Sequence, residues 1–349
     1  MNNSIKEVTI YDIAKIVGVS PATVSRGLQD HPSIRKDTKK RILDMAKEMG
    51  YRHNSFARNL RQQRTNTIGV IVHRLNSFFV ATVIAGMEKV ANEAGYNLII
   101  SQSLESFKKE AANAKTMFNS RVDGLMVSLA YDTENIDHFS DFIRKGVPVL
   151  FFDRIYDNPN CTSVFIDNYR AAFEITTHLL NQGCKNIVHI TGSLKRNVYS
   201  ERLKGYQAAL ESHGIAFDES LVLINELNEE AGIEAGKQIL QMPLKPDGVF
   251  VSNDVCAAYC MRTLKASGIS IPDDIAFAGF NNDPISRVIE PNLTTINYPA
   301  YQMGEVSAQN MIHHLIGKDG SNSTNKIIMR AEMIVRNSSL KKQTVTSVF

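Results

Sequence analysis

The chain has 349 residues, of which 43% are hydrophobic, and it carries a formal net charge of +3. This length predicts two or three domains with substantial cores rather than a single small one. No stretch is apolar over the length that a membrane-spanning helix needs, and the polar start from Met1 to Glu7 does not resemble a signal peptide. We therefore expect a cytoplasmic protein with no membrane partner.

The charge is distributed unevenly along the chain. Residues 1–65 contain 13 Lys and Arg against 6 Asp and Glu, a net of +7, whereas the remainder has 26 against 30, a net of −4. A small basic domain is typical of phosphate binding on nucleic acids, although basic patches also attract membranes and acidic proteins. The four cysteines are widely spread, so we expect buried thiols, no metal site and no cofactor.

The segment that starts at Thr9 predicts two short helices joined by a tight turn. Residues 10–17 place apolar side chains at helical spacing, and Thr9 can cap this first helix. Gly18 can adopt the positive φ of the turn, while Ser20 and Pro21 begin a second helix that ends near residue 28. Small, polar and basic side chains remain on its outer face. This pattern predicts a helix-turn-helix for the DNA major groove, with an ordinary amphipathic hairpin as the alternative.

A third helix, from Lys36 to Met49, is expected to complete the headpiece, and Gly50 ends it. Asn54 can cap one or two further turns, which would form only when DNA or a symmetry mate packs on them. We expect a headpiece over 1–53, a hinge helix and linker over 54–66, and a two-lobed ligand-binding and dimerisation domain over 67–349.

From Thr67 onward, apolar runs of strand length alternate with helical segments, which predicts α/β lobes with buried parallel sheets. The expected strands cover 68–72, 97–101, 124–128, 148–152, 164–166, 187–191, 221–224, 248–251 and 275–279. The segment around Asp123-Gly124 is echoed at Asp247-Gly248, and the rhythm restarts near Val164. We therefore expect two similar lobes in succession, with strand ends facing each other across a cleft.

Polar and aromatic side chains directly follow several of these strands and are expected to meet in the cleft. Carboxylates, amides and arginines supply bidentate hydrogen bonds, and an aromatic ring can stack on a sugar face. The candidate ligand-binding residues are Asn76, Phe78, Phe79, Gln102, Asp153, Arg154, Arg202, Asn253, Asp254 and Asn281. Each of them alone is as readily explained as a helix cap or a loop residue.

Sequence motifs of catalysis do not occur in the chain. It contains no GxGxxG segment, P-loop, HExxH helix or Gly-x-Ser-x-Gly elbow, and its nine histidines are scattered. We therefore expect no enzymatic activity and name no catalytic residue.

Nearly the whole chain resembles the lac-repressor (LacI/GalR) family of transcription regulators. The motifs that carry the resemblance are Thr9-Ile10-Tyr11-Asp12-Ile13-Ala14, Gly18-Val19-Ser20-x-x-Thr23-Val24-Ser25-Arg26, Gly50-Tyr51-x-x-Asn54, Ala57-Arg58-x-Leu60, Thr67-Ile68-Gly69, Asn76-x-Phe78-Phe79, Phe152-Asp153-Arg154, Arg202-x-x-Gly205-Tyr206, Ser252-Asn253-Asp254, Gly279-Phe280 and Leu293-Thr294-Thr295-Ile296. The resemblance implies an all-α helix-turn-helix headpiece followed by an α/β, two-lobed, periplasmic-binding-protein-like (type I) effector domain.

The resemblance also implies roles for individual residues. Positions that read bases are matched by Pro21, Ala22 and Arg26, and the wedge in the minor groove by Leu60. Positions that contact phosphates are matched by Thr9, Tyr11, Ser20, Thr23, Ser25 and Asn54. Effector contacts are matched by Asp153, Arg202 and Asn253. The chain departs from the family at Asn281, where many members carry Asp, and at His53, where proline is usual.

The function implied is that of a homodimeric regulator, expected to be a repressor, whose affinity for double-stranded operator DNA of pseudo-palindromic sequence depends on a small effector. We expect a carbohydrate or its phosphate as that effector, with a purine as an alternative. The coupling between effector and DNA is typically ~1–3 kcal/mol, and its sign decides between release and recruitment. The rival readings are a cytoplasmic solute-binding protein and a sugar-acting enzyme on the same scaffold.

Overall fold

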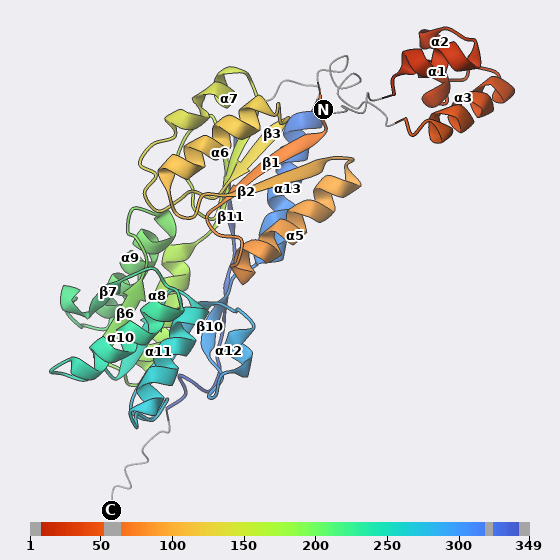
Figure 1. Cartoon of the computed structure of the whole chain (residues 1–349). Helices are drawn as coiled ribbons and strands as arrows, with labels where there is room; N and C mark the ends of the chain where they lie inside the picture. Colours follow the sequence, from red (N-terminus) through yellow and green to blue (C-terminus); the bar gives the residue numbers. More distant parts are fainter. Residues whose placement is uncertain (1–7, 52–63, 318–323, 342–349) are drawn as a thin grey trace, which may run out of the picture. The chain divides into compact units, whose positions relative to one another are not determined.

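The computed structural model describes residues 8–51, 64–317 and 324–341. Its contacts divide the chain into two units, residues 1–65 and residues 66–349, which are described one at a time. In the first unit, the helices α1 (Ile10–Val17), α2 (Pro21–Leu28) and α3 (Lys36–Glu48) form the three-helix headpiece (Figure 1).

The first two helices begin at the residues expected from the sequence. The Thr9 Oγ1 atom accepts from the Asp12 backbone N–H, and the Asp12 carboxylate accepts from the Thr9 N–H at 2.8 Å, which makes a capping box. Ser20 Oγ caps α2 by accepting from the Thr23 N–H at 3.1 Å. Gly18, at φ 75°, makes the left-handed turn between the helices.

A small apolar core holds the three helices together. Ile13 from α1, Val24 from α2 and Ile42 from α3 are fully buried within it. A Cβ on Gly27 would lie 2.6 Å from Cδ1 of Ile42, so α2 and α3 approach closely here and a larger residue would displace the end of the Ile42 side chain. This core fixes the direction in which α2 presents its outer face.

The second unit contains two six-stranded sheets, one in each lobe. The first sheet has the order β11-β5-β4-β3-β1-β2 and the second has β12-β10-β9-β8-β6-β7. All neighbouring strands are parallel except β12, which runs antiparallel to β10. The first-lobe strands are β1 (Thr67–Val72), β2 (Asn97–Gln102), β3 (Gly124–Val127), β4 (Val149–Phe152), β5 (Thr162–Ile166) and β11 (Lys326–Met329). The second-lobe strands are β6 (Ile187–Thr191), β7 (Val222–Ile224), β8 (Gly248–Val251), β9 (Ala276–Asn281), β10 (Thr294–Asn297) and β12 (Glu332–Ile334).

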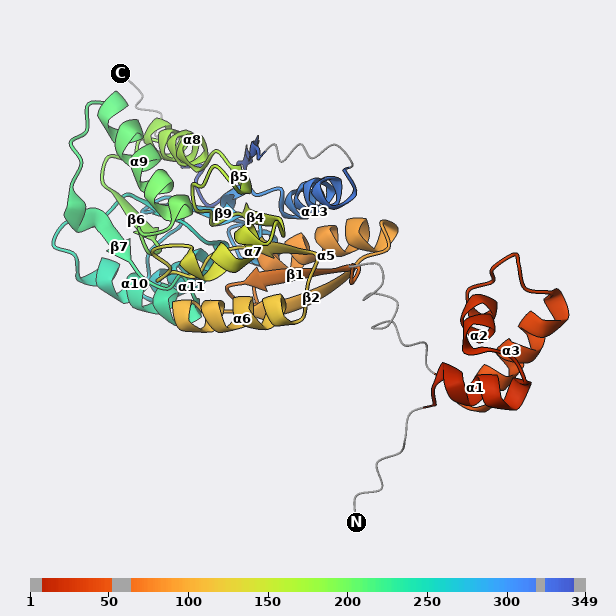
Figure 2. The same ribbon diagram turned by 90° about the horizontal axis from the view of Figure 1, so that it is seen from above.

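Helices cover both faces of each sheet, as parallel sheets require. They are α5 (Phe78–Glu93), α6 (Phe107–Asn119), α7 (Ser140–Arg144), α8 (Asn168–Asn181), α9 (Asn197–Ser212), α10 (Glu229–Gln241), α11 (Asp254–Ala266), α12 (Ile285–Val288) and α13 (Ala300–Ile316), with 3-10 turns at Asp137–Phe139 and Glu219–Leu221. Figure 2 shows α13 and α6 on opposite faces of the sheet that contains β1. In the second lobe, α8 and α9 contribute to one hydrophobic cluster, while α10 and α11 contribute to another.

Two glycines allow α5 and α13 to pack unusually closely. A Cβ on Gly86 would lie 2.1 Å from the Tyr301 carbonyl oxygen, and one on Gly304 would lie 2.0 Å from the Val83 carbonyl oxygen. At each glycine, the missing side chain leaves room for the backbone of the other helix. The hydrophobic cluster beneath this helix pair continues into α8 and α9 of the second lobe, so it spans both lobes.

The expected α/β architecture is confirmed, but the expected succession of the lobes is wrong. Strand β5, expected to open the second lobe near Val164, lies in the first sheet between β4 and β11. The chain changes sheets after β5, after β10 and between β11 and β12. The echoed segments at Asp123 and Asp247 precede β3 and β8, which occupy equivalent places in the two sheets. Among the described residues, no helix combines the length and apolarity needed to cross a bilayer.

Candidate functional site

A cavity of about 270 Å³ lies between the two lobes, at the carboxyl ends of the parallel strands. Its lining is polar, charged and aromatic, and comes from loops of both sheets. The lining residues are His73, Arg74, Asn76, Ser77, Phe78, Phe79, Glu105, Tyr131, Asp153, Arg154, Val198, Tyr199, Arg202, Glu226, Leu227, Asn228, Glu229, Ser252, Asn253, Val255, Asn281, Asp283 and Tyr298.

The cavity brings together most of the ligand-binding residues expected from the sequence. Eight of the ten line it, namely Asn76, Phe78, Phe79, Asp153, Arg154, Arg202, Asn253 and Asn281. Gln102 and Asp254 stand behind the lining. Gln102 Oε1 accepts from the Leu75 N–H at 3.0 Å, and the Asp254 carboxylate accepts from the Thr295 hydroxyl at 2.7 Å and the Asp283 N–H at 2.8 Å. Both hold loops that carry lining residues.

Asp153 is held at the end of β4 by two hydroxyl donors. The Tyr298 hydroxyl donates to Oδ1 at 2.8 Å, and the Ser128 hydroxyl donates to Oδ2 at 3.3 Å. The side chain is 5% exposed, and burial raises the pKa of its carboxyl. A carboxyl fixed in this way can accept hydrogen bonds from ligand hydroxyls in a single orientation.

Arg202, from α9, lies flat against an aromatic ring. Its guanidinium carbon is 3.5 Å from the centroid of Phe280, a distance at which cation–π attraction contributes. Nε donates to Asn168 Oδ1 at 2.9 Å, and Nη1 donates to the Ser252 carbonyl at 3.0 Å. Burial lowers the pKa of this guanidinium. The contacts orient Arg202 rigidly at the floor of the cavity.

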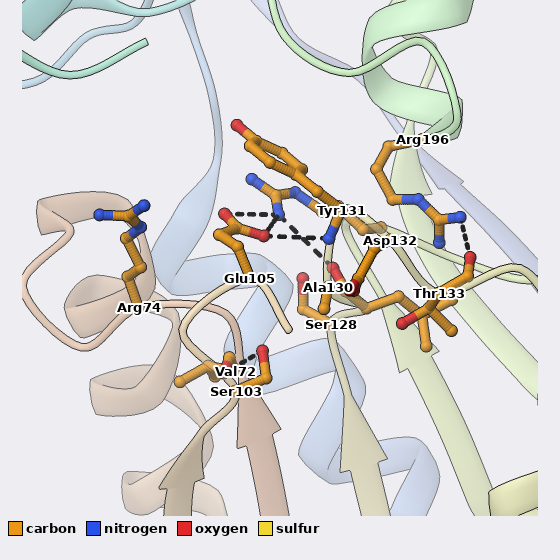
Figure 3. Close-up of polar contacts among 12 residues, drawn as sticks. Val72, Arg74, Ser103, Glu105, Ser128, Ala130, Tyr131, Asp132, Thr133 and Arg196 are labelled. Atoms are coloured by element: carbon orange, nitrogen blue, oxygen red, sulfur yellow. Dashed lines mark hydrogen bonds and ion pairs between the residues drawn. The ribbon is translucent and has the colours of Figure 1, made fainter. Parts of the chain in front are cut away.

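Arg154 is enclosed by one acid and two tyrosines. Its Nη1 donates to both Glu105 oxygens, at 3.0 and 2.8 Å, and its Nη2 donates to the Tyr199 hydroxyl at 3.1 Å. The guanidinium also lies 4.3 Å from the ring centroid of Tyr131. Figure 3 shows the Glu105 carboxylate turned toward the backbone of Tyr131, whose N–H donates to it at 3.1 Å, with Arg74 beyond it.

Backbone strain concentrates around this cavity. After β2, Leu104 and Glu105 have φ of 51° and 62°, and after β4, Asp153 has φ of 59°. At the end of β9, Asn281 and the next residue, Asn282, have φ of 118° and 58°. Non-glycine residues adopt these angles at a cost of about 1–3 kcal/mol each, and such strain clusters at functional sites. The strain here sets the direction of Glu105, Asp153 and Asn281, which all line the cavity.

Several contacts join the lobes around the cavity. The Tyr131 and Tyr199 hydroxyls are 3.1 Å apart, and Arg74 forms an ion pair with Glu226 at 3.2 Å. The Asn197 side chain accepts from the Ile155 N–H and donates to a backbone carbonyl of the first lobe. These contacts connect the closure of the lobes directly to the contents of the cavity.

Part of the lining is not predicted by the sequence. The lining residues outside the prediction include Glu105, Tyr131, Tyr199, Glu226, Ser252, Asp283 and Tyr298. The same signal, a polar or aromatic residue at a strand end, would have found Ser252 after β8 and Tyr298 after β10. Glu105 and Tyr131 lie a few residues beyond their strands, where only the loop geometry brings them back to the cavity.

The outer face of the helix-turn-helix is accessible. Tyr11 is 69% exposed, Ala22 and Arg26 are exposed, and Pro21 is half-buried at the start of α2. Thr23 and Ser25 are half-buried, while the capping residues Thr9 and Ser20 are exposed. The last two predicted DNA contacts, Asn54 and Leu60, lie outside the described residues.

Comparisons with known proteins agree with both parts of the structure. A family model described as bacterial regulatory proteins of the lacI family matches residues 9–54, and one for a periplasmic binding protein-like domain matches residues 176–339. The catabolite control protein A of Priestia megaterium is 33% identical over 301 residues, which cover 86% of this chain and 90% of that protein. The transcriptional repressor CytR of Escherichia coli is 30% identical over 334 residues, covering 95% and 96%.

Solved structures share the fold. The lac repressor dimer bound to operator and the anti-inducer ONPF matches with a TM-score of 0.84 at 22% identity, covering 96% of this chain and all of that one. The transcription regulator CcpA of Lactococcus lactis matches with a TM-score of 0.71 at 28% identity, covering 78% and 98%. Because the two curated relatives above are 33% and 30% identical over most of both chains, the chain belongs to the lacI family of bacterial regulatory proteins.

Proposed function

We propose that this DNA-binding transcriptional regulator is a repressor, that it binds a pseudo-palindromic operator as a homodimer, and that a small effector in the interlobe cavity changes its affinity for DNA. The observation that carries the proposal is the pairing, in one chain, of an accessible helix-turn-helix with a polar cavity bridged by contacts from both lobes.

The outer face of α2 suits base contacts. Arg26 can donate two hydrogen bonds to a guanine edge, and Ala22 and Pro21 can contact thymine methyl groups. The residues proposed to contact phosphates are Thr9, Tyr11, Ser20, Thr23, Ser25 and Asn54. We also propose that Leu60 inserts into the minor groove at the operator centre.

Exposed apolar side chains on the second lobe support the dimer. Val288 and Leu244 are 74% and 71% exposed, and Val288 lines a groove of about 310 Å³ together with Tyr259 and Ile289. On the first lobe, the edge strand β2 exposes Ile99 and Ile100. Exposed apolar patches of this kind mark interaction surfaces, and a two-fold axis would bring identical patches together.

The effector would act through the relative positions of the lobes. A ligand that contacts Asp153 and Arg202 on opposite sides of the cavity favours one degree of closure, and closure changes where the two headpieces emerge. Its effect on DNA affinity equals the difference in its affinity for the two forms, about 1–3 kcal/mol in typical cases.

The test uses the full-length protein and a randomised palindromic DNA library in a gel-shift selection, followed by sedimentation of the selected complex. We expect enrichment of one two-fold symmetric sequence, bound by two copies of the chain. A protein that shows no preference for any duplex over genomic competitor would contradict the proposal and favour a solute-binding role. The selected operator is then used to find effectors. Sugars, sugar phosphates and purines are added one at a time, and an effector is a compound that changes the fraction of operator DNA bound by the protein.

A further inference from the structure

The charges around the interlobe cavity point to the class of effector that it accepts. Three arginines, Arg74, Arg154 and Arg202, line the cavity. Neighbouring groups of the protein already neutralise part of the charge of each one or accept its hydrogen bonds. From this pairing we propose that the cavity takes an uncharged, hydroxyl-rich ligand of about the size of one sugar ring and excludes its phosphorylated form. The inference rests on the proposed role of this cavity as the effector site.

The Arg154 guanidinium is matched most completely. Glu105 takes up its charge through two contacts from Nη1, at 3.0 and 2.8 Å, and the Leu129 carbonyl accepts from the same nitrogen. The Tyr199 hydroxyl accepts from Nη2. Because the Glu105 and Arg154 side chains are 10% and 4% exposed, water screens the pair weakly. A phosphate would have to displace Glu105 or approach it as a second anion.

The other two arginines are also engaged. Arg74 pairs with Glu226 at the solvent-exposed mouth of the cavity, where both side chains are partly accessible. Arg202 donates to Asn168 and Ser252 and stacks on Phe280. Arg202 keeps donor capacity toward the cavity, but the ionised carboxyl of Asp153 offsets its positive charge, and both side chains lie beside Tyr298.

Two of the remaining ionisable groups at the wall are buried carboxyls, while burial lowers the pKa of the lining His73 well below its usual range, so that this ring supplies no positive charge near neutral pH. Asp153 and Asp283 are 5% and 4% exposed, and burial raises the pKa of both carboxyls, that of Asp283 to about 6. In its ionised form a carboxyl repels a phosphate, and in its neutral form it supplies no positive charge. Either form hydrogen-bonds a sugar hydroxyl, as do the amides of Asn76, Asn253 and Asn281.

Four helices begin at the cavity, and helix N-termini ordinarily attract anions. The first turn of α9 has no side-chain cap, but Val198 and Tyr199 are the residues that it presents to the cavity, and the first turns of α5, α10 and α11 are capped from within. Ser77 accepts from the Val80 N–H in α5, Asn228 from the Ala231 N–H in α10, and Asn253 from the Cys256 N–H in α11. Acidic side chains also occupy the first turns of α10 and α11. Part of the anion-binding capacity of these termini is therefore already used.

The volume of the cavity is large enough for a small ligand. The cavity of about 270 Å³ lies just below the ~300 Å³ at which pockets for drug-sized ligands begin. Phe78, Phe79 and Tyr298 contribute aromatic surface to its wall. One sugar ring that stacks on an aromatic side chain while its hydroxyls bond to carboxyls and amides fits both the size and the chemistry.

The experiment is isothermal titration calorimetry of the full-length protein with inorganic phosphate and with glucose, ribose and fructose, each paired with its monophosphate, at constant ionic strength. Wild-type protein should show no saturable heat with inorganic phosphate, and no monophosphate should bind as tightly as its free sugar. The variant Glu105→Gln removes the charge that neutralises Arg154, and it should show saturable heat with phosphate, at an affinity at least about tenfold above the detection limit that bounds the wild type. Glu174→Gln, whose partner Arg170 lies on the surface of α8, is the matched control and should gain nothing.

Two results would overturn the inference: tighter binding of a monophosphate than of its sugar by the wild type, or equal phosphate affinity in Glu105→Gln and Glu174→Gln. Should Glu105→Gln fail to fold, Glu226→Gln tests the same idea, because this glutamate pairs with Arg74 in a solvent-exposed position. The calorimetry requires no DNA. Failure to find an operator would therefore contradict the proposed function and leave the charge preference of the cavity measured.

Discussion

The Tyr131 hydroxyl lies 3.1 Å from the Tyr199 hydroxyl, and the two side chains come from opposite lobes. The Tyr199 hydroxyl also accepts from Arg154 Nη2, so one oxygen atom links the second lobe to two groups of the first. This atom connects the buried Arg154 and Glu105 pair to the relative position of the lobes.

Replacement of Tyr199 by Phe removes both contacts and leaves one Arg154 nitrogen without its acceptor. We expect the free energy of unfolding of the effector domain to fall by about 1–3 kcal/mol, since a buried donor loses its partner. Urea denaturation followed by circular dichroism measures the change. Tyr169→Phe, on the exposed face of α8, is the control, and an equal loss in both variants would remove the linking role of the Tyr199 hydroxyl.

The buried acids behind the cavity predict a dependence of stability on pH. Burial raises the pKa of Asp254 to about 7 from an ordinary value of 3.8. The folded state therefore binds a proton more tightly than the unfolded state. The stability that this proton contributes is fully present below pH 3.8 and is lost as the pH rises through about 7.

We expect Asp254→Asn to flatten this dependence, because the amide does not titrate. Between pH 5 and pH 8 the wild type should therefore lose stability relative to the variant. Chemical denaturation at several pH values measures it. The amide also loses one of the two hydrogen bonds from Thr295 and the Asp283 N–H, which lowers stability at every pH. A constant difference across this range would contradict the raised pKa of Asp254.

Much of the fold follows from the local sequence. Thr9, Gly18 and Ser20 predict the first two helices of the headpiece, because a cap or a turn depends on contacts between residues at most four positions apart. The membership of β5 could not be predicted in this way. A run such as 162–166 encodes a buried strand, whereas its sheet is decided by pairing with β4 and with β11, which lies about 160 residues further along the chain.

The candidate site shows the same division. Asp153 directly follows β4 and Asn253 is the second residue after β8, so the sequence places both at the edge of a sheet. The bond from the Tyr298 hydroxyl to Asp153 spans 145 positions, and the contact between Tyr131 and Tyr199 crosses from one lobe to the other. Such partners depend on the three passages of the chain between lobes, which no local pattern encodes.

The close packing of α5 on α13 predicts a strong effect at Gly86. A Cβ there would lie 2.1 Å from the Tyr301 carbonyl oxygen, which belongs to rigid backbone. We expect Gly86→Ala to destabilise the effector domain by about 1–3 kcal/mol or more through overpacking. Ala85→Ser, on the exposed side of the same helix, should change stability by less than about 0.5 kcal/mol in the same thermal unfolding assay. Similar melting temperatures for the two variants would contradict this account of the contact.

The exposed position of Arg26 on α2 separates reading of bases from attraction to phosphates. Arg26→Ala should cost about 1–3 kcal/mol on the selected operator and relax the preference at one base pair in each half-site, because a bidentate contact to guanine is lost. Lys47→Ala, an exposed cation in the last turn of α3, removes the same charge from another face of the headpiece. Fluorescence anisotropy on operators substituted at each position, at two salt concentrations, compares them. A uniform loss across all sequences for Arg26→Ala, matching that of Lys47→Ala, would assign Arg26 to the DNA backbone, since a phosphate contact weakens every sequence alike.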